Sequence, residues 1–226
     1  MCLTACSFQG PAATATPGDG DGDGDGDGGA QQDGPTIDAP ASGTRVFVDG
    51  PGYTGTRDTF LSAMFPDTAQ GAAAFIKWEL DVPEAGLLRF DDMFGTAADQ
   101  VPAGATITSA TLAFTVFDQS DANGDGSVVE SAIAWDEATV THDTFGGDAG
   151  IQGDEQHPEI IADLPTRTSG LHELDVTASV ERWSKGVRDN HGWLLISGNG
   201  NDELAHSSEA TDPEQRPSLT VSFTVP

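Results

Sequence analysis

The strongest constraint on this chain is an alternation of apolar and polar side chains with a period of two residues. The clearest case is the segment 218–225. Its apolar residues are Leu219, Val221, Phe223 and Val225, each preceded by Ser or Thr. Successive side chains of a β-strand point to opposite faces, so this segment predicts a strand with one buried face and one wet face.

Further segments from residue 44 onward have the same pattern, and Gly, Pro, Asp and Asn separate most of them. In the longest one, Leu112, Phe114 and Val116 are expected to point inward. About ten strands with such turns predict an all-β fold, a β-sandwich of the jelly-roll type. The predicted strands are 45–49, 57–62, 73–82, 86–91, 106–117, 127–134, 170–176, 192–197, 204–209 and 218–225.

One segment, between Asp175 and Gly186, has a helical period instead. Its apolar residues are Val176, Val180 and Trp183, at positions i, i+4 and i+7. Thr177 is placed to serve as an N-cap, and Gly186 stands where a C-terminal cap belongs. We predict one short helix packed over an end of the sandwich.

The charge of the chain excludes some partners. The 226 residues include 9 Lys and Arg against 37 Asp and Glu, a formal net charge of −28. Such a surface repels phosphate backbones and anionic lipid headgroups, so we expect no nucleic-acid partner. Many carboxylate oxygens make calcium the first cofactor to consider.

The N-terminus resembles the anchor signal of a bacterial lipoprotein. Leu3, Thr4 and Ala5 precede Cys6 as in a lipobox, which predicts that 1–6 is the remnant of a signal and that Cys6 carries the lipid. Only five residues precede Cys6, so we expect the reading frame to begin upstream. A chance match of four residues is the alternative.

Residues 7–44 are rich in Gly, Asp and Pro, and Gly and Asp alternate from Gly18 to Gly28. This composition offers nothing to bury and many charges that repel, so it predicts a disordered linker. A calcium-binding glycine-aspartate repeat is the alternative, but such repeats also need a periodic large apolar residue. The folded domain is predicted to span 45–226.

Several segments of this domain, taken in order, resemble one family. They are RDTFLS at 57–62, LLRFD at 87–91, ITSATL at 107–112, WDEATV at 135–140, DVTASV at 175–180 with Trp183 and Gly186, NHGW at 190–193, SSE at 207–209 and RPSL at 216–219. The family is the DNRLRE-type domain, grouped with carbohydrate-binding module family 96.

The resemblance implies a non-catalytic β-sandwich module of a secreted or surface protein. Some family members stand beside polysaccharide lyases or phosphoesterases, and sugar binding is implied for part of the family. This chain is expected to depart from them, because its 226 residues contain no segment that predicts a catalytic partner domain. Its Lys and Arg are also too sparse for easy binding of a uronate polymer.

A calcium loop is a candidate near residue 125. Asp121, Asn123 and Asp125 have the D-x-N-x-D-G spacing that presents three side-chain oxygens from one tight loop. A complete EF-hand places a bidentate Glu at the twelfth position, which is Ala132 here, and Glu130 comes two residues early. The same residues are typical of a hairpin turn, which is the alternative.

Aromatic side chains are the candidates for sugar binding. Trp78 on an alternating strand and Tyr53 in a Gly-rich loop are expected to be exposed and to touch a ligand, and Lys77, next to Trp78, is the third candidate ligand residue. Trp183 and Trp193 lie in apolar periodic contexts and are expected in the core. Trp135, at a strand-loop boundary, is the least certain of the four tryptophans.

Catalytic motifs do not support an enzyme. The sequence has no G-x-S-x-G and no H-E-x-x-H. His206 and Ser207 are adjacent on a predicted strand and would point to opposite faces, so they cannot readily act as base and nucleophile. Paired carboxylates of a glycosidase converge only in space, so a secreted hydrolase stays as a third hypothesis.

We therefore expect an exported, monomeric, non-catalytic module on an outer membrane or cell surface, which binds a glycan or another surface polymer. The alternative is a purely structural envelope module in which calcium stiffens a loop. The membrane is reached only through the lipid anchor.

Overall fold

The computed structural model describes residues 41–119, 126–164, 168–198 and 202–225. The compact unit of the chain that contains them spans Ala39–Pro226. The predicted anchor residue Cys6 and nearly all of the predicted linker 7–44 lie outside the described residues. Within the described residues, no helix combines the length and the apolar character needed to cross a membrane.

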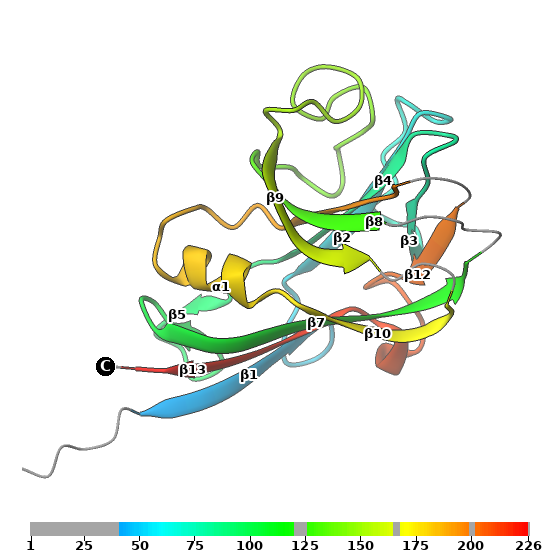
Figure 1. Ribbon diagram of the computed structural model, residues 1–226. Helices are drawn as coiled ribbons and strands as arrows, with labels where there is room; N and C mark the ends of the chain where they lie inside the picture. Colours follow the sequence, from blue (N-terminus) through cyan, green and yellow to red (C-terminus); the bar gives the residue numbers. More distant parts are fainter. Residues whose placement is uncertain (1–40, 120–125, 165–167, 199–201, 226) are drawn as a thin grey trace, which may run out of the picture. The chain divides into compact units, whose positions relative to one another are not determined.

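Two antiparallel sheets pack face to face, which confirms the predicted all-β sandwich (Figure 1). The first sheet contains, in order, β1 (Ser42–Val48), β13 (Ser218–Thr224), β7 (Thr106–Asp118), β12 (Glu203–His206) and β3 (Phe75–Trp78), and β10 (Gly170–Asp175) also pairs with β7. The second contains β2 (Thr56–Ser62), β4 (Glu84–Phe90), β11 (Trp193–Ile196), β8 (Gly126–Ser131) and β9 (Gln156–Leu164). A parallel pair, β5 (Phe94–Gly95) and β6 (Val101–Pro102), stands apart.

All ten predicted strands are present with shifted ends, but β9 and the short strands β5 and β6 were not expected from the sequence. The longest error is the segment 73–82, of which only Phe75–Trp78 forms a strand, because Glu79 and Glu84 already close a turn through paired backbone bonds. β9 is an edge strand that pairs only with β8 and contains Pro158. An edge strand needs no continuous apolar face, so it lacks a clear alternation.

The main core lies between the sheets. The inward faces of β7 and β13 are as predicted, because Leu112, Phe114, Val116, Leu219 and Val221 are fully buried. A second apolar cluster covers the opposite face of the second sheet, where the loop that follows β8 packs on it. That cluster contains Leu61, Leu87, Val129, Trp135, Val140, Phe145 and Leu194.

The two ends of the folded unit meet at one corner of the first sheet. Ser42 stands opposite Thr224 in the pairing of β1 with β13, and the Val225 N–H donates to the Ala41 carbonyl at 2.7 Å. Both strands therefore start or end at this corner, toward the lower left of Figure 1.

The predicted helix is α1 (Thr177–Ser184), and its start differs from the expectation. Thr177 is not the N-cap: its backbone N–H donates to Asp175 Oδ1 at 2.9 Å, while its own hydroxyl accepts from the Ala110 N–H. The hydroxyl thus joins the helix to β7. Val176 stands at the N-cap position, and the Asp175 carboxylate, one residue earlier, accepts from the first N–H of the helix.

Gly186 ends the helix as predicted. Its φ is +64°, and its N–H donates to the Trp183 carbonyl while the Val187 N–H donates to the Arg182 carbonyl. This pair of bonds is the Schellman motif, which needs a residue in the left-handed region.

Gly186→Ala is expected to lower the free energy of unfolding by about 1 kcal/mol, because an L side chain is disfavoured at this φ. No atom of the described residues lies within 4 Å of the position that a Cβ would take, so the loss of stability comes from backbone strain and not from a steric clash. Gly153→Ala is the control, since that site is equally open and lacks a left-handed φ. Urea denaturation measures both, and equal losses would contradict the prediction.

Candidate functional site

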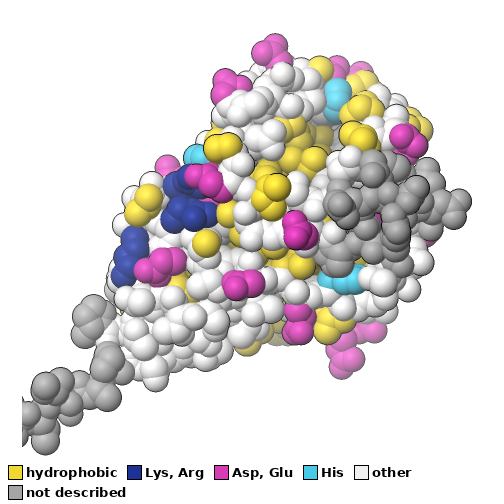
Figure 2. Space-filling model, viewed as in Figure 1, with side chains coloured by type: hydrophobic (Ala, Val, Ile, Leu, Met, Phe, Trp, Pro, Cys, Tyr) yellow, Lys and Arg dark blue, Asp and Glu magenta, His cyan; other side chains and the backbone are white. Residues whose placement is uncertain are grey.

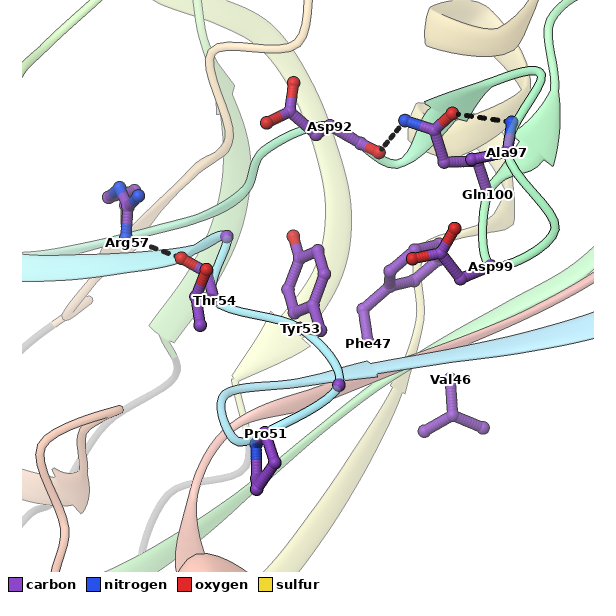
Figure 3. Close-up of a pocket in the computed structure, with 12 residues that line it drawn as sticks. Val46, Phe47, Pro51, Tyr53, Thr54, Arg57, Asp92, Ala97, Asp99 and Gln100 are labelled. Atoms are coloured by element: carbon purple, nitrogen blue, oxygen red, sulfur yellow. Dashed lines mark hydrogen bonds between the residues drawn. The ribbon is translucent and has the colours of Figure 1, made fainter.

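An open pocket of about 400 Å³ surrounds Tyr53 (Figure 3). One wall is the turn that follows β1, in which Gly50 and Tyr53 exchange backbone hydrogen bonds. The opposite wall is the segment between β4 and β6, which brings Asp92, Asp99 and Gln100 to the pocket. The site is therefore made by loops at the ends of strands, held by a rigid sandwich.

Tyr53, a predicted ligand residue, lies in the middle of this pocket and is half-buried. Its ring packs edge-on against Phe47 at 5.2 Å between centroids and lies parallel to Phe90 at 6.5 Å. Its hydroxyl donates to the Asp91 carbonyl at 2.6 Å. Burial and the nearby Asp91 and Asp92 raise the pKa of Tyr53 well above its usual range, so the phenol stays a neutral donor.

Polar groups line the rest of the pocket. Gln100 holds the loop in shape, since its amide donates to the Asp92 carbonyl at 2.8 Å and accepts from the Ala97 N–H at 3.1 Å. Arg57 donates to the Thr54 carbonyl and pairs with Asp91 at 3.4 Å. Figure 3 shows the side chains of Asp92, Gln100 and Arg57 around the Tyr53 ring.

Two carboxylates of the pocket are free to meet a ligand. Asp92 and Asp99 are exposed, and within the described residues neither carboxylate makes a hydrogen bond or an ion pair. Asp92 also has a φ of 54°, a conformation that Asp tolerates better than most residues. Carboxylate oxygens of this kind accept hydrogen bonds from hydroxyl or amine groups.

Two further hollows adjoin the pocket. One, of about 390 Å³, shares Val46 and the Pro51–Tyr53 turn with it and is bordered by Asp49 and Arg216 on the other side. The second, of about 370 Å³, shares Asp92 and reaches Asn190. The three together offer adjacent positions for successive units of an extended molecule.

Trp78 is not exposed, and that prediction is wrong. The side chain is fully buried, its ring lies edge-on to Phe114 at 6.0 Å, and its Nε1–H donates to Glu203. The error is one of phase: a residue between two charged neighbours on a strand points to the opposite face from both, which is here the core. Trp78 therefore lines none of the hollows around Tyr53.

Lys77 is engaged by acidic neighbours away from Tyr53. Its ammonium lies 2.6 Å from Glu84, 3.0 Å from Glu79 and 3.4 Å from Asp202. The structure thus separates Lys77 from Tyr53, although both are predicted ligand residues.

The remaining tryptophans are buried. Trp183 and Trp193 lie in the core, which confirms the prediction. Trp135 belongs to the second apolar cluster, where Arg89 stacks over its ring at 4.7 Å and its Nε1–H donates to the His191 carbonyl.

His206 and Ser207 do not form a pair. The Ser207 hydroxyl donates to the Ala73 carbonyl at 2.7 Å, and the His206 ring packs against Phe117 at 4.6 Å. This arrangement agrees with the structural role expected for the segment.

Of the predicted calcium ligands, only Glu130 can be placed. Asp121, Asn123 and Asp125 lie outside the described residues, and in the part of the chain that is described no group of His, Asp and Glu side chains is arranged to hold a metal ion. Calcium binding by this loop stays a prediction.

Glu130 is buried on β8 and accepts from Ser179 at 2.8 Å, from Arg182 Nε at 2.9 Å and from Arg188 at 3.1 Å. Burial alone would raise the pKa of Glu130, but these hydrogen bonds hold it below its usual value. On the face of the molecule drawn in Figure 2, dark blue Lys and Arg side chains lie together in one area, among magenta Asp and Glu side chains. The Glu130 carboxylate therefore joins α1 to the second sheet.

A cluster of carboxylates closes one edge of the second sheet. Asp58 is 1% exposed, its Oδ2 accepts from the Ser208 N–H at 2.8 Å, and its own N–H donates to Glu137 at 2.7 Å. Burial and the charges of Glu209 and Glu137 raise the pKa of Asp58 to about 8. The pKa of Glu137 is also raised, chiefly by burial. The cluster ties β2 to two connecting segments.

A scan against models of known protein families finds no match for this chain, and a search of curated proteins finds none either. The resemblance to the DNRLRE family thus remains a prediction from the segments quoted above.

Most residues of the Tyr53 pocket were missed from the sequence. Arg57 comes from β2, whereas Asp92, Asp99 and Gln100 come from the segment between β4 and β6, and no spacing in the sequence signals that these two parts converge. The available signal was weak: acidic pairs and Gly-rich turns directly after strands are where sandwich loops carry binding groups.

Glu130→Gln is expected to lower the free energy of unfolding by about 2 kcal/mol, because two arginines lose their buried partner. The loss should be the same in EDTA and in calcium if the role of Glu130 is the ion pair. Glu159→Gln is the control, since Glu159 is an exposed partner of Arg188 and should matter much less. A loss that appears only in calcium would assign Glu130 to the metal instead.

Stability should fall as the pH rises from about 4 to about 8. The folded state holds a proton on Asp58 that the unfolded chain, with its ordinary carboxyl pKa, releases, and each pKa unit corresponds to about 1.4 kcal/mol. Asp58→Asn keeps an acceptor for Ser208 and removes the titration, so its free energy of unfolding should change less over this range. Urea denaturation at a series of pH values measures this, and parallel curves for the two proteins would refute it.

Proposed function

We propose that this chain is an exported, non-catalytic β-sandwich module that binds a neutral glycan, or a similar hydroxyl-rich polymer, in the pocket around Tyr53. The observation that carries the proposal is the row of adjoining hollows at this site. An aromatic ring, an amide, a guanidinium and two free carboxylates line the central hollow. Sugars are bound by such a mixture of one apolar surface and several hydrogen-bonding groups.

The size of the site supports an extended ligand. The central hollow of about 400 Å³ has neighbours of similar volume on both sides, so a chain of sugar units could occupy consecutive positions. All three are open to solvent, which suits a polymer that continues beyond the site.

The charge of the site supports a neutral ligand. Asp92 and Asp99 are exposed in the pocket, and the protein carries a formal charge of −28. A uronate or sulfated polymer would be repelled, while hydroxyl groups can donate to these carboxylates.

The module would act as a monomer displayed on the cell surface. In this proposal a lipid on Cys6 holds it to the membrane, and the acidic segment between Cys6 and β1 spaces it from the surface. Such a linker lets the module reach ligand throughout a larger volume around its anchor, without adding any contact to the binding site.

An array of neutral and anionic polysaccharides, with and without calcium, tests the proposal. We expect binding to neutral polymers, and calorimetry with the tightest of them should show that Asp99→Ala weakens affinity about tenfold, the effect of a lost hydrogen bond to a charged group. Asp154→Ala, an exposed acid outside these hollows, should leave affinity unchanged. If no polymer binds, the structural envelope module becomes the better hypothesis.

A further inference from the structure

A second pocket of different chemistry lies on the outer face of the second sheet. Its volume is about 180 Å³, and its lining is mostly apolar: Leu61, Leu80, Pro83, Ala85, Ile151 and Ile196. It shares no lining residue with the hollows around Tyr53. The hairpin between β3 and β4 forms one side, and the loop that precedes β9 forms the other; both lie toward the top of Figure 1.

The pocket is the open end of the second apolar cluster. Leu61 is buried there, while Ile151 and Ile196 are only partly buried and pack against the cluster. Leu80 stands at the tip of the hairpin with 47% of its surface exposed. An apolar group that entered this pocket would extend the cluster and remove these side chains from water.

The mouth of the pocket carries net negative charge. Glu79 and Glu84 both line it, and both lie against Lys77, which also pairs with Asp202. Three carboxylates against one ammonium leave a net charge of −2 in this group.

His142 also lines the pocket, and its Nδ1 lies 3.2 Å from the Asp143 carboxylate. The Asp143 carboxylate adds to the negative field at the mouth. A cation is therefore attracted to the site, and an anion is repelled.

The volume sets the size of the ligand. A cavity of about 150 Å³ is enough for one benzene molecule, so this pocket has room for one branched aliphatic chain or one aromatic ring. We propose that it binds a small cation with an apolar body, of the class of primary alkylamines and arylalkylamines. The apolar body packs between Leu61 and Ile151, and the ammonium group lies at Glu79.

Three ligands with one carbon skeleton test the proposal on the full chain: 3-methylbutylamine, 3-methylbutan-1-ol and 3-methylbutanoate. They are titrated at pH 7 and followed by NMR chemical shifts. The amine should bind about fivefold more tightly than the alcohol, the effect of one partly exposed ion pair, and the acid should bind most weakly. If none of the three binds, or if the acid binds as tightly as the amine, the proposal is overturned.

Two variants with matched controls locate the binding. Ile151→Phe fills the pocket and should weaken the amine and the alcohol at least about tenfold, as expected when a fitted apolar group is excluded. Ile160→Phe, the same change at a side chain 62% exposed on β9, should have no effect. An equal effect of the two variants would place the ligand elsewhere and refute the site.

The second pair tests the charge. Glu79→Gln should remove the preference for the amine and leave alcohol binding unchanged, while Glu173→Gln on exposed β10 should change neither. A preference that survives Glu79→Gln contradicts the assigned position of the ammonium group. Thermal melts show whether each variant is folded. If a variant is unfolded, the comparison of the three ligands on the unmodified protein decides the proposal. Glycan binding at Tyr53 does not depend on either outcome.

Discussion

The packing of Trp193 is the interaction on which the rest of the structure depends. This fully buried residue of β11 lies 4.8 Å from the ring of Trp183 in the helix and 6.4 Å from the ring of Phe90 in β4. Its Nε1–H donates to Ser179, and Ser179 in turn donates to Glu130. A large apolar body and a satisfied polar atom thus meet where the helix packs on the second sheet, which fixes α1 over the end of the sandwich.

The strands hold the loops, and the loops carry the candidate chemistry. Tyr53 follows β1 in the first sheet, and Asp92 follows β4 in the second, yet both border one hollow. Neither segment has a fixed place without its strand, so the spacing of the sheets determines the width of the pocket. The hydrogen bonds of Gln100 to Asp92 and Ala97 then set the local shape of one wall.

The sequence predicted what depends on local periodicity. Alternation placed the inward residues of β7 and β13, and Gly186 was read correctly because only the left-handed region suits that cap. The prediction that Trp78 is exposed failed because its charged neighbours were taken as a sign of its own exposure, whereas alternation implies that it points to the opposite face. Contacts between distant segments could not be predicted. The arginine partners of Glu130, for example, are 52 and 58 residues away along the chain.

The convergence of Asp58, Glu137 and Glu209 was equally hidden. Its two hydrogen bonds join Asp58 to Glu137 and to Ser208, which are 79 and 150 positions away along the chain. A single sequence has no local pattern that shows which distant residues will meet, whereas the periods of strands and helices repeat within a few residues.

The meeting of the two ends of the folded unit has a topological consequence. Ala41 and Val225 are already hydrogen-bonded neighbours, and paired Cα atoms of antiparallel strands stand only about 5 Å apart. A few added residues could join these ends into a closed ring, and the chain could then be opened at another surface turn. A circular permutant of this kind would keep every strand pairing, so the order of strands along the polypeptide is not itself what the architecture requires.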